Sequence, residues 1–302
     1  MKIVFFGTPD FAVATLNAIV ENKFEVLAVV TAPDKQSGRG MKLQESAVKK
    51  YALEKNLTIL QPEKLKDALF IEALKNLNAD VFIVVAFRML PEIVWNMPPM
   101  GTINLHGSLL PQYRGAAPIN WAIIRGEKTT GVTTFKLQHE IDTGNILMQE
   151  HIEILETDNA GSLHDKMMNI GAELMVKTLK NIEKNTITET KQILHESIKH
   201  APKIFTETCK IVWDDNGKNI YNFIRGLSPY PAAFSYLNHK KIKIFETKIE
   251  LESHEIPIGT VLSDNKTYLK YSCKDGFIHL LVLQLEGKTK MKVEDFLRGY
   301  KV

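Results

Sequence analysis

Three uninterrupted apolar segments in the first third of the chain restrict the folds that are open to it. They are KIVFFG at residues 2–7, FEVLAVVT at 24–31 and DVFIVVAF at 80–87, and helical patterns at about residues 10–21 and 44–55 separate them. Strands that are apolar throughout are typical of a parallel sheet with helices on both faces. We therefore expect an α/β domain with a Rossmann-like, mostly parallel sheet. Ligands of such sheets bind beyond the carboxyl ends of the strands.

A change of pattern after the long helix expected at about residues 159–183 divides the chain into two domains. Residues 186–204 lose the helical periodicity, and we interpret them as a linker. Beyond it, five or so short strands within about 100 residues indicate a smaller OB-like β-barrel. The prediction is a first domain at residues 1–185, the linker at 186–204 and a second domain at 205–302.

The composition excludes several classes of protein. No apolar run approaches the roughly 18 residues that a membrane span needs, and no basic and apolar leader precedes the first strand. The two cysteines, Cys209 and Cys273, lack CxxC spacing, which argues against a thiolate metal site. We expect a cytoplasmic protein without a membrane partner, and we expect a monomer.

Charge is unevenly distributed along the chain. Residues 205–302 contain 15 Lys and Arg against 12 Asp and Glu, whereas the upstream part contains 23 of each. The excess is compatible with an anionic partner for the second domain, but a lysine-rich composition gives the same pattern and is the favoured interpretation of the charge alone.

The first strand leads into a loop that lacks a dinucleotide fingerprint. FFGTPDFA contains the single glycine Gly7 where a dinucleotide-binding fold has GxGxxG. Thr8 and Pro9 instead predict a helix start, with Thr8 as the N-cap. An NAD-dependent enzyme is therefore the weaker interpretation.

Two polar residues stand where another apolar strand ends, in the stretch INLHGSLLPQYRGAAPIN. Residues two apart on a strand face the same side, so Asn104 and His106 project together at the carboxyl edge of the sheet. An amide N–H can stabilise a carbonyl oxygen that becomes negative, and histidine titrates near neutrality. The pair suits attack on an acyl carbon.

Asp142 is the candidate third member of this site. It lies in HEIDTGNIL, between two predicted strands. A carboxylate beside His106 would orient the imidazole and raise its proton affinity, or would itself take a proton through water. The residues DTGN are also typical of a turn, and on spacing alone a simple turn former is the favoured interpretation of Asp142.

At this point the chain resembles a known family, the methionyl-tRNA formyltransferases. The resemblance covers nearly the whole chain and rests on INLHGSLLPQYRGAAPINWAIIRGE, GVTTFKLQHEIDTGNIL, FFGTPDFA, TAPDKQSGRGMKLQESAVK and IRGLSPYPAAF. It implies transfer of a formyl group from 10-formyltetrahydrofolate to methionyl initiator tRNA, with no metal.

The resemblance also implies roles for individual residues. Asn104, His106 and Asp142 match the catalytic trio of the family, and the folate-binding segment is matched by Ser108, Leu109, Leu110 and Pro111. DKQSGRGMK resembles a basic loop that binds the acceptor end of the tRNA, and its cationic residues are Lys35, Arg39 and Lys42. Lysines can meet phosphates in this way, and an arginine can also stack on a base.

Two other functions remain open at this stage. A formyltransferase with a small amine acceptor, such as a ribonucleotide or an amino sugar, would share the trio but leave the second domain unexplained. A non-catalytic RNA-binding or folate-binding protein would leave the trio without a purpose.

Overall fold

A computed structural model of the protein describes residues 1–37, 42–193 and 198–302. Contacts between residues divide the chain into two compact units, and each unit combines segments that are separate in the sequence. The first unit consists of Met1–Gly115, Thr130–Ile152 and His164–His200, and the second of Ala116–Thr129, Glu153–Leu163 and Ala201–Val302. The predicted division at residues 186–204 stays a prediction, which limited proteolysis can test.

The first unit contains a seven-stranded sheet. Its strands are β1 (Lys2–Gly7), β2 (Glu25–Val30), β5 (Ile59–Leu60), β6 (Val81–Val85), β7 (Thr102–His106), β9 (Thr129–Lys136) and β10 (Ile146–Glu153). They are arranged in the order β10-β9-β7-β6-β1-β2-β5. The five strands from β7 to β5 in this order pair in parallel, whereas β9 runs antiparallel to β7. The predicted Rossmann-like, mostly parallel sheet is confirmed.

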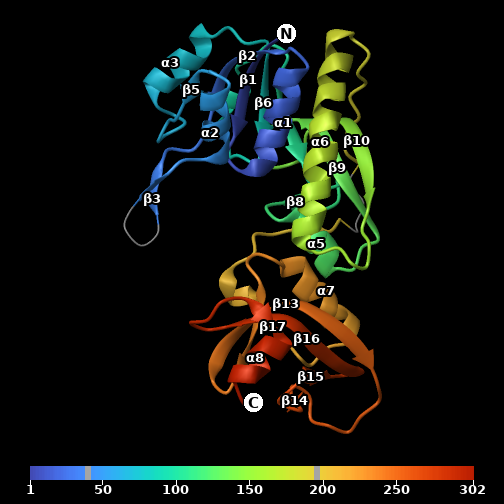
Figure 1. Ribbon diagram of the computed structural model, residues 1–302. Helices are drawn as coiled ribbons and strands as arrows, with labels where there is room; N and C mark the ends of the chain where they lie inside the picture. The colour runs from blue at the N-terminus through green and yellow to red at the C-terminus, as the bar shows by residue number, and fades with distance from the viewer. Residues whose placement is uncertain (38–41, 194–197) are drawn as a thin grey trace. The chain divides into compact units, whose positions relative to one another are not determined.

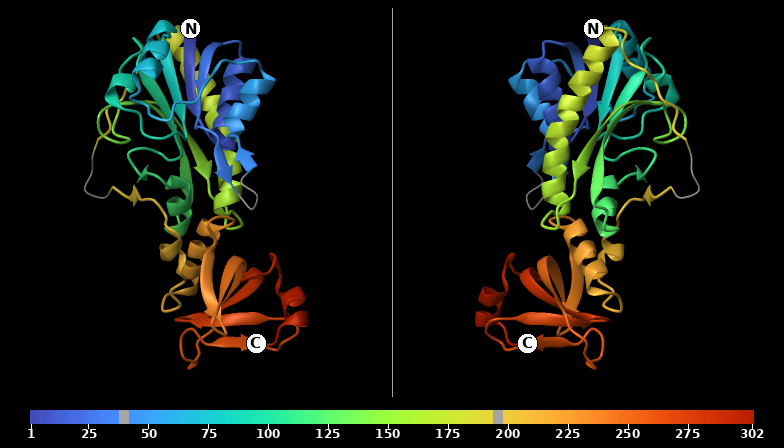
Figure 2. Two further views of the ribbon diagram at one scale, coloured as in Figure 1. Left: turned by 90° about the vertical axis from the view of Figure 1, so that its left-hand side faces the viewer. Right: turned by 90° about the vertical axis from the view of Figure 1, so that its right-hand side faces the viewer.

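Helices cover both faces of this sheet because its buried strands present apolar side chains to each side. On one face, residues of β1 and β6 form a buried cluster with α3 (Ala68–Asn76) and α4 (Glu92–Trp95). On the other face lie α1 (Asp10–Glu21) and the long helix α6 (Ala160–Glu183). Figures 1 and 2 show α6 running alongside the sheet.

The N-cap of α1 differs from the prediction. The helix begins at Asp10, and Pro9 occupies the N-cap position in an extended conformation. The Pro9 carbonyl accepts a helical hydrogen bond from the Ala12 N–H at 2.9 Å. Thr8 therefore lies one residue too early to cap the helix, and its predicted role is wrong. Helix α2 (Ala47–Glu54), expected at about residues 44–55, does have a side-chain cap, because the Ser46 hydroxyl accepts from the Lys49 N–H.

The second unit contains a curled antiparallel sheet. Its strands are β12 (Ala233–Leu237), β13 (Lys240–Leu251), β14 (Val261–Ser263), β15 (Leu269–Cys273), β16 (Gly276–Leu285) and β17 (Met291–Lys292). Their path is β12-β13-β16-β15-β14, and β17 pairs with β16. The register of β13 against β16 shifts on both sides of Glu246, and such irregularities increase the local twist of a sheet. The prediction of a smaller OB-like domain is confirmed at this level.

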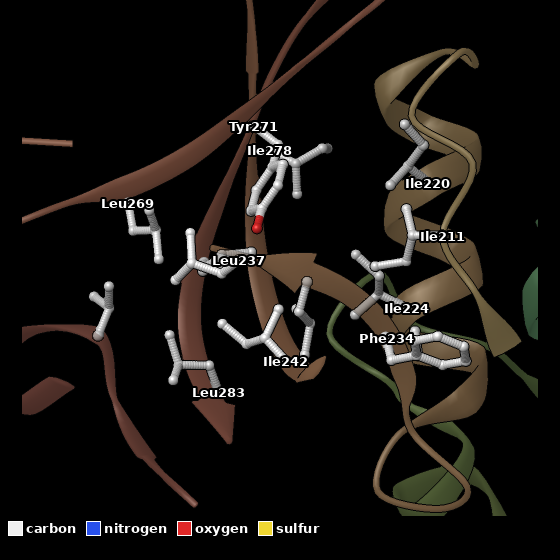
Figure 3. Packing of buried hydrophobic residues seen from close by; sticks show 14 of the residues in the cluster. Ile211, Ile220, Ile224, Phe234, Leu237, Ile242, Leu269, Tyr271, Ile278 and Leu283 are labelled. Atoms are coloured by element: carbon white, nitrogen blue, oxygen red, sulfur yellow. The ribbon is translucent and has the colours of Figure 1, made fainter. Parts of the chain in front are cut away.

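Helix α7 (Gly217–Leu227) packs its apolar side against this sheet. Figure 3 shows Ile224 of the helix beside Phe234 of β12, with Ile220 farther along the helix and Ile242 on a neighbouring strand. All four side chains are buried in one hydrophobic cluster. The second unit therefore has a core of its own. None of the described helices of either unit is long and apolar enough to span a membrane.

Candidate active site

The carboxyl end of β7 places Asn104 and His106 on one face of the first unit's sheet. Asn104 is paired with Val84 of β6 and with Phe135 of β9, and His106 with Thr133 of β9. Pairing on both sides holds the strand backbone in place. Asn104 is half-buried, and His106 is 6% exposed. The predicted shared orientation of these two residues is present.

A backbone hydrogen bond determines which nitrogen of His106 faces the site. Nε2 lies 2.9 Å from the carbonyl oxygen of Tyr113. Because a carbonyl only accepts, Nε2 must carry a proton and donate it. Nδ1 is then the nitrogen that can gain or lose a proton. The ring also packs edge-on against Phe135, with 6.4 Å between the centroids.

Asp142 lies beside this free nitrogen. Its Oδ2 atom is 3.8 Å from His106 Nδ1, and its side chain is 13% exposed. The same Oδ2 atom accepts a hydrogen bond from the Gly115 N–H at 2.9 Å. The backbone of Asp142 has a φ of 55°, a conformation that aspartate tolerates better than most residues. Asp142 therefore both forms a turn and contributes a carboxylate to the site.

The Asn104 carboxamide is the third polar group at this strand end. Within the described part of the chain, no hydrogen bond to its side chain is formed. A half-buried amide with free donors can bind a ligand oxygen. Together, these groups offer an amide donor, an imidazole nitrogen and a carboxylate.

The segment Ser108–Pro111 forms a braced loop after β7. The Ser108 hydroxyl is buried and donates to the Gln112 carbonyl oxygen at 2.6 Å. The Leu110 carbonyl accepts from Gln149 Nε2 at 2.9 Å, and the Leu110–Pro111 peptide bond is cis. The buried side chains of Ser108 and Leu110 thus support the loop, while Leu109 and Pro111 are half-buried. Folate binding by these four residues stays a prediction.

A pocket that the sequence did not predict lies beside the end of β6. It has a volume of about 720 Å³. Its walls are mostly apolar and are formed by Leu65, Lys66, Ile71, Arg88, Met89, Leu90, Pro91, Glu92, Ile93 and His139. His139 comes from the loop that also contains Asp142. The described lining includes none of the trio and none of Ser108–Pro111.

Two short strands, paired as a hairpin, contain the first and last residues of the basic loop. Strand β3 (Lys35–Ser37) pairs antiparallel with β4 (Lys42–Gln44), and the Lys35 side chain is exposed. Arg39 lies outside the described residues. Lys49 of α2 forms ion pairs with Asp34 before the hairpin and with Glu45 after it.

Two charged groups near these sites have shifted pKa values. The hydrogen bond from Lys49 lowers the pKa of Asp34. Partial burial lowers the pKa of the Arg114 guanidinium, and the nearby carboxylates of Asp142 and Glu140 oppose that shift. Among the residues that the structure describes, no group of three or more His, Cys, Asp or Glu side chains is placed to hold a metal ion.

Comparison with known proteins gives matches over both parts of the chain. The family model described as formyl transferase matches residues 1–179, and the model described as formyl transferase, C-terminal domain, matches residues 203–301. The chain is 52% identical to the methionyl-tRNA formyltransferase of Bacteroides thetaiotaomicron, over 100% of this chain and 96% of that protein. It is also 52% identical to that of Flavobacterium johnsoniae, over 99% of this chain and 96% of the relative.

Solved structures share the fold at lower sequence identity. An N-formyltransferase from Helicobacter canadensis, in complex with folinic acid and dTDP-3-aminofucose, has a TM-score of 0.69 at 23% identity. That match covers 96% of this chain and 100% of the other. HypX from Aquifex aeolicus, in complex with tetrahydrofolic acid, has a TM-score of 0.68 at 21% identity, over 100% of this chain and 48% of the other.

Proposed function

The chain belongs to the methionyl-tRNA formyltransferase family, and on that premise we propose that it transfers the formyl group of 10-formyltetrahydrofolate to the α-amino group of methionyl initiator tRNA. The single observation that carries this proposal beyond the family is the pairing of His106 Nδ1 with Asp142 Oδ2 at a sheet edge. The product is N-formylmethionyl-tRNA, the form used in translation initiation. We place the reaction in the cytoplasm. That the protein is a monomer stays a prediction.

The chemistry needs a neutral amine with a free lone pair and an oxygen that can carry negative charge. The neutral amine attacks the formyl carbon, a bond from nitrogen to that carbon forms, and the carbonyl oxygen becomes negative. The bond from the carbon to N10 of the folate then breaks, N10 takes up a proton, and tetrahydrofolate leaves. The amine loses a proton in the course of the reaction.

The polar groups at the end of β7 match these needs. The free amide of Asn104 donates to the developing oxyanion, an effect worth about 3 kcal/mol per donor in other acyl-transfer sites. A protonated His106 adds a second donor through Nδ1–H, because Nε2–H is already bound to Tyr113. The Asp142 carboxylate, acting with His106, accepts the proton that the amine releases.

We assign the donor's ring system to the pocket beside β6. Its apolar walls would bury a flat ring, and His139 connects it to the loop of Asp142. The position agrees with the general rule that ligands bind beyond the carboxyl ends of parallel strands. We assign Ser108–Pro111 to the part of the donor nearest the formyl group, since this loop follows His106 directly.

The tRNA contacts are assigned to the basic loop and to the second unit. Lys35, Arg39 and Lys42 would meet the acceptor end, with the hairpin anchored by Lys49. In the second unit, Lys241 lies 3.7 Å from the centre of the Phe234 ring, and the neighbouring Tyr236 is 50% exposed. A lysine beside an exposed aromatic ring suits contact with a nucleic acid backbone and its bases.

Transfer of labelled formyl from 10-formyltetrahydrofolate tests the proposal. The acceptors to compare are methionyl initiator tRNA, methionyl elongator tRNA and a panel of small amines that includes ribonucleotides and amino sugars. We expect selective labelling of the initiator tRNA. Labelling of a small amine instead would overturn the tRNA assignment, and the absence of any transfer would overturn the enzymatic function.

A further inference from the structure

Gln192 lies in the segment predicted as a linker, yet its side chain is 7% exposed and has four hydrogen bonds. Its Nε2 group donates to the carbonyl oxygens of Asp142 at 2.9 Å and of Gly144 at 2.8 Å. Its Oε1 atom accepts from Arg114 Nε at 3.2 Å and from Arg114 Nη2 at 2.5 Å. Both donor hydrogens and both lone pairs of the carboxamide are used.

These contacts join the two segments that hold the Asp142 carboxylate. Asp142 sits in a left-handed backbone conformation with a φ of 55°, which the surrounding structure must support. Gln192 supports it through the Asp142 and Gly144 carbonyls. On the other side it holds Arg114, and the next residue, Gly115, donates its N–H to the Asp142 carboxylate. One buried amide thus fixes both the turn and its partner.

We propose that Gln192 is a positioning residue for formyl transfer, which holds the Asp142 carboxylate at its place beside His106. This inference rests on the proposed function, because Gln192 would hold one member of the catalytic trio in place without belonging to the trio. If Gln192 only filled space, its replacement would change the stability of the fold but not the rate of formyl transfer. A satisfied buried amide also specifies one arrangement of the groups around it.

Two substitutions separate the parts of this role. Gln192→Leu keeps a side chain of similar size and removes all four hydrogen bonds. Gln192→Glu keeps an acceptor for Arg114 but removes the donors to the Asp142 and Gly144 carbonyls. We expect kcat to fall by about 100-fold in both, as for other small displacements of catalytic groups, while KM for the donor changes little.

The matched control is Gln284→Leu in the second unit. Gln284 Nε2 also donates to a backbone carbonyl, that of Lys288 at 2.8 Å. This substitution should leave kcat unchanged. Circular dichroism and thermal unfolding of each variant show whether it folds.

A double-mutant cycle with Asp142→Asn gives the decisive comparison. If Gln192 acts through Asp142, Gln192→Leu should slow the wild-type enzyme strongly and the Asp142→Asn enzyme very little. If Gln192→Leu lowers kcat by the same factor in the wild-type and in the Asp142→Asn enzyme, the positioning role is wrong. Full kcat in a folded Gln192→Glu variant would overturn it too, even if Gln192→Leu does not fold. Failure of the wild-type enzyme to transfer formyl would contradict the proposed function instead.

Discussion

His106 Nδ1 lies 3.8 Å from Asp142 Oδ2, while His106 Nε2 donates to the Tyr113 carbonyl. The second contact fixes the tautomer, so the nitrogen that exchanges a proton is the one that faces the carboxylate. The separation is longer than a direct hydrogen bond. A reacting amine that approaches from the side could therefore form hydrogen bonds to both groups without displacing either residue.

Asn104→Ala tests the amide as a donor to the oxyanion. We expect kcat to fall by about 10²–10³-fold, because the negative oxygen would lose one donor in the transition state. Donor affinity, measured by fluorescence titration with tetrahydrofolate, should be nearly unchanged. Asn22→Ala is the control, since the Asn22 amide caps the end of α1 by donating to the Ala18 carbonyl. An equal loss of folate affinity in Asn104→Ala would contradict this role.

Gly144→Ala tests the turn that follows Asp142. A Cβ at this position would lie 1.6 Å from the Lys136 carbonyl oxygen, so the backbone must move. We expect a loss of about 1–3 kcal/mol in the free energy of unfolding, together with a lower kcat. Urea unfolding measures the first effect. Gly299→Ala should change neither quantity, because an added Cβ there would have no heavy atom within 4 Å apart from those of its chain neighbours and its own helix. Wild-type stability and activity in Gly144→Ala would show that the turn relaxes freely.

Arg39→Ala tests the basic loop. We expect KM for methionyl initiator tRNA to rise, while kcat at saturating tRNA changes little, because the loss is of binding shared by ground and transition states. Initial rates at low and at saturating tRNA measure the two quantities. Lys75→Ala on α3 removes an exposed cation elsewhere on the same unit and serves as the control. If formylation at low tRNA concentration is unaffected by Arg39→Ala, the loop assignment is wrong.

Glu250→Gln tests an electrostatic contribution to the stability of the second unit. Hydrogen bonds from His279 and Lys270 lower the pKa of Glu250 from 4.5 to about 2. Since the folded-state pKa is depressed, the ionised carboxylate stabilises the fold above about pH 4.5, and this contribution is lost as the pH falls toward 2. The difference in Tm between the wild type and Glu250→Gln should therefore shrink between pH 5 and pH 3. A difference that stays constant over this range would contradict the account, and Glu255→Gln is the exposed control.

The sequence predicted most of what depends on local periodicity. Helix α1 has the predicted bounds Asp10–Glu21, because its apolar residues recur at helical spacing. The common face of Asn104 and His106 follows from the alternation of side chains along a strand. Asp142 satisfies both interpretations that spacing left open, as a turn residue and as a neighbour of His106.

Features that depend on distant contacts could not be predicted in this way. Gln192 looks like any polar residue in a linker, because its partners lie about 50 and 80 residues earlier in the chain. The pocket beside β6 combines residues 65–93 with His139, and no local pattern marks that meeting. Helix α3 was missed as well. Its buried side is narrow and includes Phe70 and Leu74 only, although Asp67 provides a clear N-cap signal.

The most direct test of the account is a single-turnover measurement with Asp142→Asn. Labelled formyl transfer to methionyl initiator tRNA is followed with enzyme in excess, for the wild type, for Asp142→Asn and for Asp165→Asn. Asp165 is the control because its carboxylate also faces a histidine, His164, at 3.0 Å, but on an exposed helix surface. We predict that the wild type and Asp165→Asn react alike, and that Asp142→Asn is slower by about 10²–10⁴-fold while still binding both substrates. Transfer at the wild-type rate by Asp142→Asn would contradict the claim that this carboxylate and His106 carry out the reaction.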